Sequence, residues 1–67
     1  MRFKVNGELF EGINADTITG LLRHLDIDES RVAAAEVNLS IVRRADFSSF
    51  KLKDGDQIEI VNFVGGG

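Results

Sequence analysis

The sequence predicts an α+β domain in which one helix crosses one face of a small mixed sheet. The chain has 67 residues, which is the length of one domain. One apolar stretch has helical spacing, whereas the other apolar stretches alternate with polar residues as strands do. One helix and one small sheet bury both of their apolar surfaces when the helix lies across the sheet.

The first predicted element is a β-hairpin at the N-terminus. Met1, Phe3 and Val5 alternate with polar residues, which is the period of a half-buried strand. Asn6 and Gly7 follow, and both residue types tolerate the positive φ of tight hairpin turns. An Asn-Gly pair between two strand-like stretches therefore predicts the hairpin turn.

The second predicted element is a short helix. Its apolar face is formed by residues at helical spacing, namely Ile18, Leu21, Leu22 and Leu25. Asp16 or Thr17 is suited to cap the first turn by accepting hydrogen bonds from its free N–H groups. Gly20 lies inside this helix, so either a neighbour packs closely there or the helix is weakened.

A second hairpin is predicted over residues 30–44. We expect Ala33, Ala35 and Val37 to face the core together from its first strand, with Ile41 and Val42 on the return strand. A single helical turn follows over residues 46–49. Three apolar residues are expected to close the bottom of the core: Phe47, Phe50 and Leu52.

The last predicted strand covers residues 57–63, after a tight turn at Asp54 and Gly55. A hairpin, a crossover helix and further strands make up the β-grasp, or ubiquitin-like, plan, with a mixed sheet of about five strands. We therefore expect one β-grasp domain over residues 1–64 and a flexible glycine tail over residues 65–67.

The composition excludes several classes of function. The chain has no cysteine, so it has no disulfide, thiolate metal site or thiol nucleophile. Its one histidine, His24, is expected to be a solvated helix residue, since one imidazole does not make a metal site. The net charge of −3 argues against nucleic-acid binding. The N-terminus resembles neither a signal peptide nor a membrane span, which favours a cytoplasmic protein.

The last strand and the residues after it are the candidate functional site. Ile58 and Ile60 fall on the face expected to meet the core, whereas Val61 and Phe63 fall on the other face. Exposed apolar side chains grouped on a small protein can mark a partner surface. We therefore expect Val61, Phe63 and Val64 to take part in docking a partner.

The chain then ends in Gly65, Gly66 and Gly67. Glycine lacks a Cβ, so this tail is thin as well as flexible, and it suits a narrow channel. An α-carboxylate has a pKa of roughly 3.3–3.7, so it is ionised at neutral pH and reacts only after activation by another molecule. A folded body, an apolar docking surface and a slim reactive arm are the features of a carrier.

Four stretches, in this order, resemble the ThiS family of sulfur carriers in thiamine biosynthesis: VNGELFE, DTITGLLRHL, VAAAEVN and LKDGDQIEIVNFVGGG. The resemblance covers essentially the whole chain. Its most specific part is the Lys-Asp-Gly-Asp turn with the apolar strand and the glycines. Diglycine ends also occur in the small subunit of molybdopterin synthase (MoaD) and in ubiquitin-like modifiers, so the ending by itself indicates only the superfamily.

The resemblance implies a mechanism. A ThiF-type adenylating enzyme uses ATP and Mg to convert the Gly67 carboxylate into an acyl-adenylate, and a persulfide sulfur from a cysteine desulfurase displaces AMP. A ThiG-type thiazole synthase takes sulfur from the resulting thiocarboxylate. Gly65 and Gly66 then provide access, and Val61, Phe63 and Val64 dock partners. We expect that the chain itself binds no cofactor, is not an enzyme, has no membrane partner and is a monomer when free.

The chain departs from the family pattern at two places. The family commonly has Asn-Gly at the second hairpin, where this chain has Asn38 and Leu39. Left-handed leucine costs ~1–2 kcal/mol, so we expect a different turn geometry there. The family also often has a proline near residues 42–44, which this chain lacks.

Three alternatives stay open at this point. The chain is also compatible with a sulfur carrier for molybdopterin or another acceptor. A ubiquitin-like modifier would be joined to lysines of other proteins. A plain β-grasp interaction module would not need its glycines.

Overall fold

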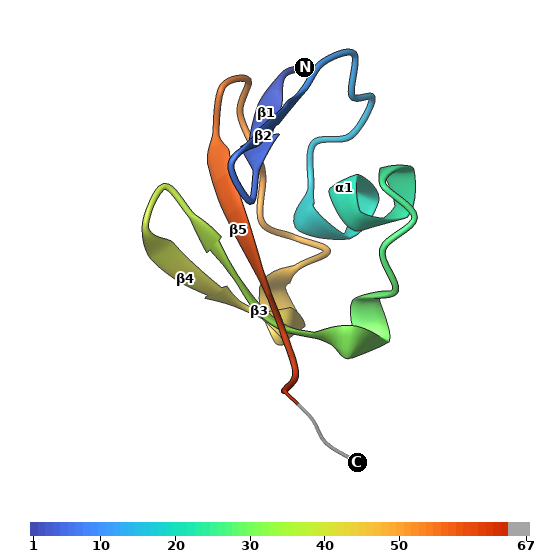
Figure 1. Ribbon diagram of the computed structural model, residues 1–67, viewed down its shortest axis with the longest axis vertical. Coiled ribbons are helices and arrows are strands. Elements are labelled where there is room, and N and C mark those ends of the chain that lie inside the picture. Colours follow the sequence, from blue (N-terminus) through green and yellow to red (C-terminus); the bar gives the residue numbers. More distant parts are fainter. Residues whose placement is uncertain (65–67) are drawn as a thin grey trace.

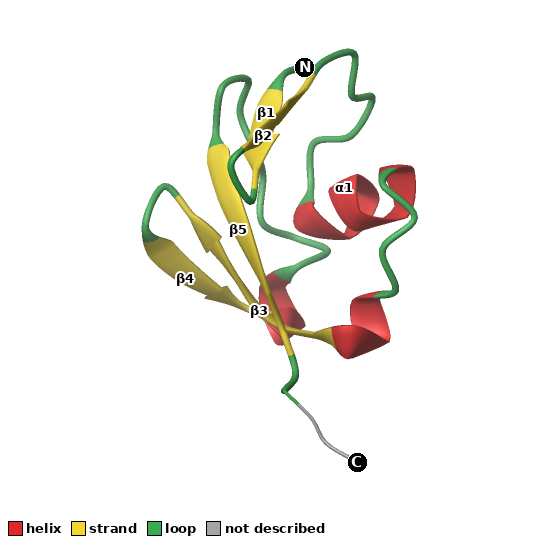
Figure 2. Ribbon diagram, viewed as in Figure 1, coloured by secondary structure: helices red, strands yellow, loops and turns green. Residues whose placement is uncertain are grey.

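Five strands form one mixed sheet in the order β2-β1-β5-β3-β4. The main helix and the short helical turn that follows it lie to one side of these strands, as Figure 1 and Figure 2 show. The computed structural model describes residues 1–64. The elements are β1 (Phe3–Val5), β2 (Glu8–Phe10), α1 (Ile18–His24), the 3₁₀ turn η1 (Glu29–Arg31), β3 (Val32–Val37), β4 (Ser40–Arg43), the 3₁₀ turn η2 (Arg44–Asp46) and β5 (Gln57–Asn62). This order and sheet confirm the predicted β-grasp fold.

Strand β5 lies in the middle of the sheet between β1 and β3. It runs parallel to β1 and antiparallel to β3, and the two hairpins are antiparallel. The predicted turn at Asn6 and Gly7 is confirmed, because both residues have positive φ, of 50° and 83°. The core between α1 and the sheet includes Phe3, Ile18, Leu21, Leu22, Phe47 and Ile58.

Helix α1 begins as the sequence predicts. Of the two candidate caps, Thr17 is the one used, because its Oγ1 accepts a hydrogen bond of 3.1 Å from the Gly20 N–H. Gly20 is explained by close packing. A Cβ at this position would lie 3.2 Å from both the Ala15 Cβ and the Thr17 Oγ1, closer than most real Cβ contacts.

Strand β3 corrects one prediction. Ala35 and Val37 are buried as expected, but Ala33 is only half-buried, and Val32 takes the buried position instead. The register against β5 shifts between Val32 and Ala34. A β-bulge of this kind adds one residue to one strand and so breaks the simple alternation of faces.

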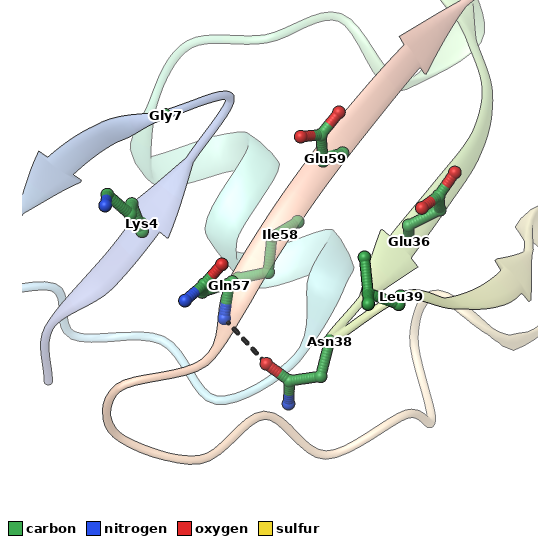
Figure 3. A pocket seen from close by; sticks show the side chains of 8 residues that line it. All are labelled: Lys4, Gly7, Glu36, Asn38, Leu39, Gln57, Ile58 and Glu59. Carbon is green, nitrogen blue, oxygen red and sulfur yellow. Dashed lines mark hydrogen bonds between the residues drawn. The ribbon is translucent and has the colours of Figure 1, made fainter.

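The turn between β3 and β4 corrects a second prediction. Asn38 and Leu39 have φ values of 51° and 73°, so both are left-handed and the expected difference in geometry is wrong. Asn38 holds this turn against the start of β5. Its backbone N–H donates to the Gln57 carbonyl at 2.8 Å, and its Oδ1 accepts from the Gln57 N–H at 3.0 Å (Figure 3).

The remaining segment agrees with the sequence to within three residues. The helical turn covers Arg44–Asp46 rather than residues 46–49, and β5 ends at Asn62 rather than at residue 63. Phe47 and Leu52 are buried, and Phe50 packs half-buried against the core. No helix within residues 1–64 is long and apolar enough to cross a membrane.

Candidate functional site at the end of β5

Two asparagines from the hairpin turns hold the first part of β5 in place. Asn6, after β1, accepts a hydrogen bond of 2.7 Å at its Oδ1 from the Ile60 N–H. Asn38, after β3, accepts from the Gln57 N–H on the opposite side of the strand. Both asparagines have left-handed backbones and also donate their own N–H groups to β5, Asn6 to the Ile58 carbonyl and Asn38 to the Gln57 carbonyl.

The side chains of β5 alternate as the sequence predicts. Ile58 faces the core and is 1% exposed, and Ile60 is half-buried against the same core. Val61 lies on the open face and is 43% exposed, and Phe63, just after the strand, is 59% exposed. The exposure of these two residues is confirmed, while their role in docking stays a prediction.

Phe63 is the last residue that the body of the protein holds through its backbone within residues 1–64. Its N–H donates to the Arg31 carbonyl at 2.9 Å. The Arg44 guanidinium lies over its ring, 5.7 Å from the centroid, which is a cation–π distance. Val64, the next residue, is fully exposed. The predicted tail residues Gly65, Gly66 and Gly67 lie outside the described part of the chain.

The open face around Val61 contains apolar residues that the sequence analysis did not assign to the site. Ala34 of β3 pairs with Val61 of β5 on one side and with Arg43 of β4 on the other. In the next row, Glu36 lies between Glu59 and Ile41, and Ile41 is well exposed. Strand alternation was the available signal, because an inward Val42 requires an outward Ile41.

An open hollow lies beside the end of β5. It is lined by Ser30 and Arg31 of η1 and by Asn62 and Phe63. The hollow adjoins the point where the chain leaves the sheet, so a partner at the end of β5 also meets this hollow.

The ionisable groups of residues 1–64 lie mainly on the surface, and two carboxylates among them have lowered pKa values. Within residues 1–64, no three His, Cys, Asp or Glu side chains are grouped to hold a metal ion. His24 is exposed, as expected. Hydrogen bonds from Ser30 lower the pKa of Asp28, and the Arg2 N–H lowers the pKa of Asp54. Both carboxylates hold turns, so these shifts belong to the fold.

The chain matches the ThiS family over residues 3–67. It belongs to the ThiS family. A crystal structure of the thiamine biosynthesis protein ThiS from Geobacter metallireducens has the same fold as this ThiS-family chain. The two share 32% identity with a TM-score of 0.79, and the match covers 100% of both chains.

Longer proteins also contain a segment similar to this ThiS-family chain. A thiazole synthase of Paramagnetospirillum magneticum is 40% identical over 67 residues, and one of Magnetococcus marinus is 37% identical. The chain spans only 20% of the length of each synthase. An uncharacterized protein, ycf40, of Porphyra purpurea is 34% identical, and the match covers 96% of this chain and 89% of that protein.

Proposed function

We propose that this chain is a sulfur carrier in thiamine biosynthesis and that Gly67 bears the sulfur. The observation that carries the proposal is the family match, which extends through the glycines to residue 67. The position of β5 supports it, because the central strand of the sheet leads directly toward those glycines.

In the proposed mechanism, other proteins supply the chemistry and this chain supplies the carrier arm. A ThiF-type enzyme adenylates the Gly67 carboxylate with ATP and Mg, and a persulfide sulfur from a cysteine desulfurase displaces AMP. The Gly67 thiocarboxylate then donates its sulfur to thiazole synthase. In this division of labour the partners carry out the chemical steps, and we propose that the carrier is not itself an enzyme.

The proposed docking surface is the exposed apolar group Val61, Phe63 and Val64. Phe63 is suited to this role because its backbone and the Arg44 guanidinium fix its position while most of its ring stays accessible. A preordered aromatic side chain loses little conformational entropy when a partner covers it. Gly65 and Gly66 would then pass into the partner's channel.

Thiazole synthase is the partner that the relatives favour, because two curated synthases carry a segment similar to this whole chain. One polypeptide that holds both parts keeps carrier and acceptor together. We propose that the sulfur passes to thiazole synthase in the cytoplasm and that the carrier, when free, is a monomer.

The proposal is tested by deleting Gly66 and Gly67 and measuring thiazole formation with purified adenylating enzyme, sulfur donor and thiazole synthase. We expect loss of sulfur transfer with an unchanged melting temperature, because no core residue is removed. Unchanged transfer would overturn the proposal. Transfer to molybdopterin synthase instead of thiazole synthase, or isopeptide-linked conjugates in cells, would replace it with another carrier or with a modifier.

A further inference from the structure

Strand β5 has a hydrogen-bonding edge that its neighbour β1 covers only in part. β1 pairs with β5 at Gln57 and Ile58, and β1 and β2 lie beside the first part of β5 while its last part continues past them (Figure 1). The Asn6 N–H then donates to the Ile58 carbonyl, and the Asn6 side chain accepts from the Ile60 N–H. Coverage from the β1 side ends with Asn6.

The groups beyond Asn6 follow from the antiparallel register. In an antiparallel pair, successive residues point their N–H and C=O groups alternately toward and away from the partner strand. The Phe63 N–H meets the Arg31 carbonyl on the β3 side, so Asn62 and Ile60 point their backbone groups the other way. Within residues 1–64, the Ile60 carbonyl and the Asn62 N–H and carbonyl have no hydrogen-bond partner.

The two residues that carry these three groups are not buried. Asn62 is exposed and Ile60 is half-buried. Asn62 also lines the open hollow that Ser30, Arg31 and Phe63 share. An extended peptide placed in line with β1 would therefore find backbone partners along β5 and room for side chains at its end. An exposed row of strand N–H and C=O groups is the chemistry that accepts an added strand.

We propose that this half-edge of β5, formed by Ile60 and Asn62, binds an extended segment of thiazole synthase as an added strand. The inference rests on the proposed function, since the same strand leads into the glycines that the synthase would receive. A segment of the synthase beside the channel that receives those glycines would lie next to the half-edge. Added-strand pairing fixes the direction in which the tail leaves β5, and thereby aims Gly67 at the acceptor.

The test compares Asn62→Pro with Asn62→Ala. Proline removes the outward N–H and fills its place, and it is tolerated where a strand N–H faces solvent. Alanine removes the side chain but keeps the N–H. Binding to thiazole synthase of the same organism is measured by calorimetry. We expect Asn62→Pro to raise Kd at least about tenfold, and Asn62→Ala to change it less than about twofold.

A second measurement uses the unmodified protein and so does not depend on how proline is accommodated. Residue-resolved amide hydrogen exchange should show a fast Asn62 N–H and a slower Phe63 N–H in the free carrier. Saturation with thiazole synthase should slow the Asn62 N–H strongly. Melting temperatures of both variants verify that the body remains folded.

Equal affinities for both variants, or an Asn62 N–H that stays fast in the complex, would overturn the half-edge while leaving the carrier function intact. Absence of binding by the unmodified protein would also overturn it. In that case thiocarboxylate formation is measured with the adenylating enzyme and sulfur donor in the absence of thiazole synthase. If the thiocarboxylate forms, the carrier function stands although the half-edge proposal fails.

Discussion

Strand β5 begins between two hydrogen-bonded neighbours and ends beside only one. Its first part pairs with β1 and β3 and is held by the side chains of Asn6 and Asn38. Its last part keeps β3 and the contact from Phe63 to Arg31, and it presents apolar side chains to solvent. The difference separates two tasks along one strand, since the first part anchors the fold and the last part is available to a partner.

The strongest test of the anchored part is Ile58→Ala. Ile58 is 1% exposed in the core, so we expect a loss of about 2–5 kcal/mol in the free energy of unfolding. Glu59→Ala is the matched control, because Glu59 is exposed on the opposite face. Urea denaturation measures both. A loss below about 1 kcal/mol for Ile58→Ala would contradict an anchored first part.

Asn6→Ala should have the next largest effect. It removes the acceptor of the Ile60 N–H and places alanine at a φ of 50°, so we expect a loss of about 1–3 kcal/mol. Asn6→Gly keeps the turn conformation but also lacks the acceptor, so its smaller loss measures the hydrogen bond alone. If glycine restores full stability in urea denaturation, the side chain of Asn6 does not hold β5.

Leu39→Gly should strengthen the turn that supplies Asn38. Leu39 is 90% exposed at a φ of 73°, so it adds backbone strain and contributes little burial. We expect a gain of about 1 kcal/mol, read as a higher melting temperature. A lower melting temperature would mean that Leu39 makes a stabilising contact.

Asp54→Asn should lower stability slightly at neutral pH, and the difference from the unmodified protein should disappear in acid. The Arg2 N–H donates to the Asp54 carboxylate at 2.6 Å and holds its pKa below the ordinary value of 3.8. A carboxyl group with a depressed folded pKa stabilises the fold above its unfolded pKa, and this contribution disappears as pH falls through the folded pKa. The melting temperature of Asp54→Asn should therefore fall less than that of the unmodified protein between about pH 5 and about pH 2. Parallel pH curves would contradict this role.

Phe63→Asp should change stability least and binding most. Phe63 is largely exposed, so we expect the free energy of unfolding to stay within about 0.5 kcal/mol. Affinity for thiazole synthase should fall, because the proposed docking surface loses its aromatic side chain and gains a charge. Phe63→Leu, which remains apolar, is the control. A large loss of stability with unchanged affinity would assign Phe63 to the fold instead.

The first hairpin turn and the two faces of β5 could be predicted from the sequence, because each depends on the preferences of neighbouring residues. Asn6 with Gly7 specified the first turn, and alternation in β5 separated buried Ile58 from exposed Val61. The second turn was not predictable from residue preferences. There, two hydrogen bonds between Asn38 and Gln57, which are far apart in sequence, accompany a leucine in a conformation that favours glycine.

The bulge in β3 and the half-edge of β5 were hidden for a related reason. Both depend on where a neighbouring strand ends or shifts its register. The alternation of apolar and polar residues predicts which face of the sheet a side chain lies on, but not which strand it pairs with. Ala33 was therefore predicted on the wrong face of the sheet. The unpaired backbone groups of Ile60 and Asn62 could not be predicted from the sequence.

The most direct test of the central claim is the intact mass of the carrier. The protein is incubated with ATP, a ThiF-type adenylating enzyme and a sulfur donor, with a parallel sample that lacks ATP. We predict a mass gain equal to the replacement of one oxygen by sulfur, localised to the C-terminal peptide and absent without ATP. No gain with an enzyme that is active on a control carrier would contradict the assignment of Gly67 as the sulfur-bearing residue.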